Sequence, residues 1–145
     1  MPESLTSIAL IQPFFGMVSF LFSNGFRDYV GMISFNLFWT LVIELILAII
    51  LGVRNKEDLL LVFEVNCLTN PIAVTILFFL TRSSVGTVTE QVIVLFIEAV
   101  VVVTEGMIYK RRLSEQKRNP FLLSFILNAA SYGTGIALEL LSVPV

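Results

Sequence analysis

The sequence predicts an all-α integral membrane protein, a bundle of four to five transmembrane helices. The chain has 145 residues, of which 57% are hydrophobic, and its mean hydropathy is +0.92. Soluble domains are nearer half apolar. The apolar residues lie in runs long enough to cross a bilayer, and one pattern of polar residues occurs twice along them. This second observation predicts a tandem, parallel repeat of two helical hairpins.

The first element is an apolar run at Leu5–Phe22, which a proline and a glycine interrupt. A signal peptide normally begins with basic residues, whereas the only charged residue before this run is Glu3. We therefore expect a retained helix, with a cleaved signal as the alternative. Asn24-Gly25 is a strong turn signal, so residues 1–28 are expected to form an N-terminal helix and a turn.

Four further apolar runs each approach the ~20 residues that cross ~30 Å of hydrocarbon. They pair into two hairpins, at residues 29–81 and 82–145. We expect the transmembrane helices at Tyr29–Val53, Leu59–Thr81, Val88–Tyr109 and Phe121–Leu141.

The basic residues are concentrated in the turn of each hairpin. Of the nine Lys and Arg residues, only Arg27 and Arg82 lie outside the turns at Arg54–Asp58 and Lys110–Asn119. The positive-inside rule places these two turns in the cytoplasm and the C-terminus outside. We expect the plasma membrane of a bacterium as the location.

Composition argues against several classes of function. The chain has no His, which removes the usual zinc ligand and the usual base of hydrolase triads. Cys67 is its single cysteine, so it has no intramolecular disulfide, and we interpret this residue as a small apolar core residue. A net charge of −2 gives no reason to expect a nucleic-acid partner. No cofactor is expected.

Each hairpin carries a Glu and then a Gly on its first helix, and an Asn followed by a hydroxyl residue on its second. These residues are Glu44, Gly52, Asn66 and Thr69 in the first hairpin, and Glu98, Gly106, Asn128 and Ser131 in the second. The longer second turn absorbs the difference in spacing, because insertions cost least in turns. A chance alignment of apolar helices is the alternative.

The two Glu and the two Asn of this repeat are expected in one layer near the middle of the bilayer. At ~1.5 Å of rise per residue, they lie roughly 12–18 Å from the cytoplasmic turns. No Lys, Arg or His lies at their depth in the sequence. A carboxylate in hydrocarbon that has no basic neighbour must bind a proton, a cation or a partner.

Carboxylate, amide and hydroxyl oxygens form a ligand set that suits Na⁺, Ca²⁺, Mg²⁺ or Mn²⁺, or an organic cation. We therefore predict a binding site for a proton, a cation or a cationic substrate, without assigning a metal. Its predicted residues are Glu44, Glu98, Asn66, Asn70, Asn128, Thr69 and Ser131. For Thr69 and Ser131 the alternative is a hydroxyl that only joins helices.

Two other features lie outside the predicted binding site, and we expect each to affect only its own helix or helix end. Glu64 and Glu105 lie within two helical turns of the cytoplasmic basic residues. An ion pair at the membrane interface, such as Glu105 with Lys110, is therefore their expected role. Pro71 should kink its helix and free a backbone carbonyl.

These features favour a small transporter or channel-like protein that moves a proton, a cation or a cationic substrate. Its partners would be the lipid bilayer and a second copy of the chain, because four or five helices make a thin wall around a path. The alternative is an assembly subunit whose buried Glu residues pair with a basic transmembrane residue of a partner subunit. An intramembrane enzyme is the weakest reading, since only paired carboxylates could act as acid and base.

Overall fold

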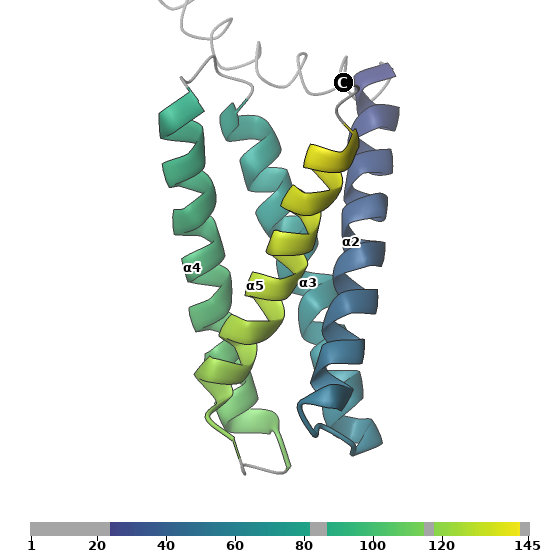
Figure 1. Cartoon of the computed structure of the whole chain (residues 1–145), viewed down its shortest axis with the longest axis vertical. Coiled ribbons are helices and arrows are strands. Elements are labelled where there is room, and N and C mark those ends of the chain that lie inside the picture. The colour runs from purple at the N-terminus through teal and green to yellow at the C-terminus, as the bar shows by residue number, and fades with distance from the viewer. Residues whose placement is uncertain (1–23, 82–86, 115–117, 143–145) are drawn as a thin grey trace, which may run out of the picture. The chain divides into compact units, whose positions relative to one another are not determined.

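The computed structural model describes residues 24–81, 87–114 and 118–142. These residues form four α-helices and no strand: α2 (Asn24–Ile50), α3 (Lys56–Thr81), α4 (Thr87–Arg112) and α5 (Pro120–Ser142) (Figure 1). Each helix contains a stretch long and apolar enough to cross a membrane. The predicted all-α fold is confirmed, and the four helices indicate a membrane-embedded protein.

The chain divides into two compact units, Met1–Ser34 and Phe35–Val145. Within the first unit, the structure describes only the start of α2. The sequence predicted a turn up to Asp28, whereas α2 already begins at Asn24. The physical reason is that Asn is as favourable at the N-terminus of a helix as it is in a turn. The predicted helix at Leu5–Phe22 lies outside the described residues.

The turn of the first hairpin begins with a Schellman motif, which ends α2. Gly52 has a φ of 94°, a left-handed conformation that glycine adopts without steric cost. Its N–H donates to the carbonyl of Ile49 at 3.0 Å, and the N–H of Val53 donates to the carbonyl of Ala48 at 2.9 Å. These two bonds satisfy carbonyls that the end of the helix leaves free.

An asparagine begins the second helix of each hairpin. Asn55 Oδ1 accepts from the backbone N–H of Glu57 at 3.2 Å. Asn119 Oδ1 accepts from the N–H of Phe121 at 3.0 Å, and Pro120 fits the first helical position because it needs no N–H partner there. Both caps therefore follow from local sequence chemistry.

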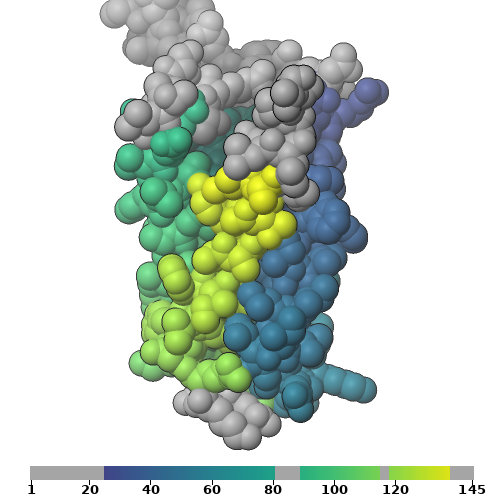
Figure 2. Space-filling view, in the orientation of Figure 1, coloured from purple at the N-terminus to yellow at the C-terminus, as the bar shows by residue number. Residues whose placement is uncertain are grey.

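The apolar core of the second unit lies toward the two hairpin turns, which Figure 1 shows at one end of the helices. Side chains from all four helices contribute to it. The buried members are Ala48, Leu61, Val62, Val65, Tyr109, Leu113, Leu123 and Leu127. Figure 2 shows α5, in yellow-green, between α4 and the second-unit part of α2 on one face.

Two local contacts hold helices together at this end. Asp58 is buried at the start of α3, and its carboxylate accepts from the backbone N–H and the hydroxyl of Ser114, both at 2.8 Å. This contact joins the turns of the two hairpins. Gly106 lies so close to α5 that a Cβ atom there would overlap the Phe121 ring.

Large apolar side chains also cover the outside of the second unit. Phe35 is 63% exposed, Phe96 69% and Ile50 71%. A surface of this kind is unfavourable in water. It is the surface expected where helices contact lipid, since hydrocarbon is as apolar as these side chains.

Candidate functional site

Two carboxylates lie fully buried between the helices. Glu44 on α2 and Glu105 on α4 each have 0% of their surface exposed. Buried carboxylates are costly unless hydrogen bonds compensate them, so the donors around each define what the site can do.

Glu44 accepts hydrogen bonds from two helices. The Asn66 amide on α3 donates to Oε2 at 2.7 Å. The Ser131 hydroxyl on α5 lies 3.0 Å from Oε1. Each carboxylate oxygen therefore has a neutral partner.

Glu105 has three neutral partners. The Thr69 hydroxyl on α3 lies 2.7 Å from Oε1. On α5, the Asn128 amide donates to Oε2 at 2.5 Å, and the Ser124 hydroxyl lies 3.1 Å from the same oxygen. The expected ion pair at the helix end is therefore not the role of Glu105, because α4 directs this side chain into the bundle.

The two carboxylates are bound in the same way. Each accepts from an Asn of its own hairpin, which follows the Glu by 22 residues in the first hairpin and by 23 in the second. Each also contacts a hydroxyl of the other hairpin, Ser131 for Glu44 and Thr69 for Glu105. The carboxylate of each hairpin is thus hydrogen-bonded to a side chain of the other hairpin.

The hydroxyl groups at this site have more acceptors than hydrogens. Thr69 Oγ1 lies 3.0 Å from the Val65 carbonyl as well as near Glu105. Ser131 Oγ lies 3.0 Å from the Asn128 carbonyl as well as near Glu44. A hydroxyl has one hydrogen, so it satisfies one of these acceptors. A proton on the carboxyl group would supply the second hydrogen bond.

Tyr109 lies one helical turn after Glu105 and is also fully buried. Its phenol hydroxyl has no hydrogen-bond partner among the described residues. Groups of this kind usually mark an unseen water or ion. The interior around the carboxylates therefore has an unused donor beside the bonds described above.

A second polar cluster joins α2 to α3. The Asn70 amide nitrogen donates to Asn36 Oδ1 and to Thr40 Oγ1, both at 3.1 Å. With Asn36 Oδ1 and Thr40 Oγ1 as the acceptors, the hydrogen-bond network assigns the nitrogen of the Asn70 amide to this side. Asn70 Oδ1 is consequently a buried acceptor, and it has no donor among the described residues.

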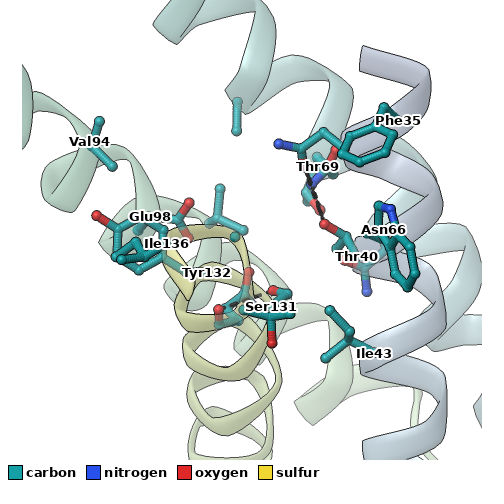
Figure 3. Close-up of a pocket in the computed structure, with 18 residues that line it drawn as sticks. Phe35, Thr40, Ile43, Asn66, Thr69, Val94, Glu98, Ser131, Tyr132 and Ile136 are labelled. Atoms are coloured by element: carbon teal, nitrogen blue, oxygen red, sulfur yellow. Dashed lines mark hydrogen bonds between the residues drawn. The ribbon is translucent and has the colours of Figure 1, made fainter. Parts of the chain in front are cut away.

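A cavity of about 830 Å³ opens beside both clusters (Figure 3). Four of the five side chains that hydrogen-bond to the two buried carboxylates also line it, namely Asn66, Thr69, Asn128 and Ser131. Glu98 on α4 lines the same cavity and is half-buried. The cavity therefore borders the buried carboxylates through shared side chains.

The residues predicted for the site divide into two groups. Five of them form the network around the buried carboxylates: Glu44, Asn66, Thr69, Asn128 and Ser131. Asn70 and Glu98 line the cavity but do not join that network. Pro71 lies within a helix that continues to Thr81.

Sequence reasoning missed Glu105 and Ser124. The Glu-to-Asn separation, 22 residues in the first hairpin and 23 in the second, could have identified Glu105. Glu98 and Glu105 are seven residues apart and so share a helix face, which is why helical periodicity alone did not separate them. For Ser124 we find no signal in the sequence.

No three His, Cys, Asp or Glu side chains of the described ranges converge as a metal site. Comparisons with protein-family models, curated proteins and solved structures return no match for this chain. The site is therefore interpreted from its own residues.

Proposed function

We propose that this chain is a small membrane transporter or channel-like protein that binds a proton at its buried carboxyl groups and a cation or cationic substrate in the adjoining cavity. One observation carries the proposal. Four of the five side chains that hydrogen-bond to Glu44 and Glu105 also line the cavity. A ligand that moves these side chains changes the hydrogen bonds of the carboxyl groups, and this links ligand to proton.

The hydrogen-bond count supports a proton at each carboxyl group. A protonated Glu105 donates to Thr69 Oγ1, which frees the Thr69 hydrogen for the Val65 carbonyl. A protonated Glu44 does the same for Ser131. Ionised carboxyl groups would leave these acceptors competing for single hydrogens, and intramembrane carboxyl groups commonly act as proton relays.

The proposed protein lies in a bacterial plasma membrane with both basic turns in the cytoplasm. Residues 29–81 and 82–145 are its two halves, and a homodimer would provide a thicker wall around the path. The competing proposal is an assembly subunit whose buried Glu residues pair with a basic residue of another protein. The internal donors around Glu44 and Glu105 favour transport over that role.

Flux through the full chain in liposomes tests the proposal. Gradients of Na⁺, K⁺, Mg²⁺ and tetraphenylphosphonium are imposed one at a time while an enclosed dye reports pH. We expect at least one gradient to move protons, and the double variant Glu44→Gln/Glu105→Gln to lose about tenfold or more of that flux. Glu64→Gln is the matched control, because Glu64 is exposed on α3.

Proton movement that persists in the double variant would overturn the proposal, as would its absence under every gradient. Copurification of a stoichiometric membrane partner, lost on Glu44→Gln, would support the assembly subunit instead.

A further inference from the structure

The cavity beside the carboxyl network has the size of a small-molecule site. Its volume of about 830 Å³ falls in the upper part of the ~300–1,000 Å³ range of ligand pockets. Its lining combines apolar and aromatic side chains with several amide and hydroxyl groups and, among the described residues, a single carboxylate. The polar groups therefore decide which ligand fits.

Among the residues that the structure describes, Glu98 is the one acidic residue that lines the cavity. It is half-buried, and it makes no hydrogen bond or ion pair with any described residue. No described Lys or Arg lines the cavity with it. A carboxylate in this position attracts a positive charge, because partial burial strengthens Coulomb interactions.

Aromatic side chains form other parts of the wall. Phe35 and Trp39 come from α2, and Tyr132 comes from α5. Figure 3 shows Glu98 and Tyr132 on one side of the cavity and Phe35 on the other. Aromatic faces attract organic cations and also bury their apolar groups.

The Asn70 carbonyl oxygen adds a hydrogen-bond acceptor. The amide nitrogen donates to the Asn36 and Thr40 oxygens, so the amide oxygen takes no part in those two contacts. It is buried and has no donor among the described residues, although Asn70 lines the cavity. A ligand with an N–H or O–H group would satisfy it.

From these observations we infer that the cavity binds an organic cation with an apolar body, whose positive centre pairs with Glu98 and whose apolar groups pack on Phe35, Trp39 and Tyr132. This inference rests on the proposed function, since it assigns the ligand class of the same cavity. The three aromatic side chains favour an organic over an inorganic cation, because they pack on apolar groups and supply no ligand set for a metal ion.

Binding to the purified full chain in nanodiscs tests the ligand class without any transport. The probe is tetraphenylphosphonium, and tetraphenylborate is an anion of the same shape. Trp39 is the only tryptophan of the chain and lines the cavity, so its fluorescence reports occupancy. We expect saturable binding of the cation, weakened about tenfold or more by Glu98→Gln, and unchanged in the control Glu64→Gln.

Equal affinity of the cation for the Glu98→Gln variant would overturn the inference, as would anion binding that matches cation binding. Circular dichroism and a melting curve confirm that the variant is folded. Proton flux without binding of the organic cation would refute the ligand class and leave the proposed function standing. Binding that depends on Glu98, without any proton flux, would refute the proposed function and leave the ligand class standing.

Discussion

Asn66 and Asn128 use their two amide hydrogens in the same way. Each donates one to a backbone carbonyl four residues earlier, at 3.1 Å for Val62 and 3.0 Å for Ser124. Each donates the other to a buried carboxyl group. The bond to its own helix holds the side chain in one rotamer, so the donor is already oriented toward the carboxyl group.

Replacing Glu105 distinguishes a neutral carboxyl group from a charged one. Glutamine can accept from Asn128 and donate to Thr69, which is the pattern of a protonated acid. We expect Glu105→Gln to change the free energy of unfolding by less than about 1 kcal/mol, and Glu105→Ala to lower it by about 2–3 kcal/mol, since three side chains lose a buried hydrogen-bond partner. Unfolding in detergent measures both. A Gln variant as unstable as the Ala variant would mean that the carboxylate is charged.

The sequence predicted the kinds of groups at the site, buried carboxyl and amide groups, better than it predicted which residues supply them. Glu44, Asn66 and Asn128 were identifiable because polar residues in apolar runs have few alternatives to facing one another. The choice between Glu98 and Glu105 depends on which turn of α4 lies level with α5. Side-chain packing decides that contact, and a single sequence does not report it.

Among the elements, the four helices were predictable because length and hydropathy suffice for a membrane span. Which residue of the first hairpin corresponds to which residue of the second was not predictable. The sequence paired Gly52 with Gly106, yet Gly52 follows the end of α2, whereas Gly106 lies inside α4. Pairing Glu44 with Glu105 instead aligns both the carboxyl groups and the helix ends. The repeat itself stays a prediction, now with this register.

The close approach of α4 and α5 predicts an element-level effect. A Cβ at Gly106 would overlap the Phe121 ring, whereas nothing lies within 4 Å of a Cβ at Gly133. Both glycines are inside helices, where Ala alone would be favourable. We expect Gly106→Ala to destabilise the protein by about 1–3 kcal/mol and Gly133→Ala to be neutral or stabilising in thermal unfolding. Phe121→Leu should partly rescue Gly106→Ala, and failure of both expectations would contradict the packing.

For the second unit as a whole, we expect polar contacts to contribute to the association of the two hairpins beside the apolar core that they share. In lipid, apolar helices gain little from packing against one another instead of against hydrocarbon chains. The contacts of Asp58 with Ser114, Glu44 with Ser131 and Glu105 with Thr69 all cross between hairpins. Interhelical hydrogen bonds in membranes contribute ~0.6 kcal/mol each on average, so we expect these three contacts to add to the association of the hairpins.

Removing one crossing hydroxyl while keeping its shape tests this view of the whole unit. Thr69→Val deletes a bond to its own helix and the bond to Glu105. Thr104→Val deletes only a bond to its own helix, at 2.7 Å from the Val100 carbonyl, and is the matched control. We expect Thr69→Val to lower the free energy of unfolding by about 0.6–1.7 kcal/mol more than the control, measured by denaturant titration in mixed micelles. Equal losses would mean that the crossing bond contributes nothing to holding the hairpins together, and that apolar packing near the turns is sufficient.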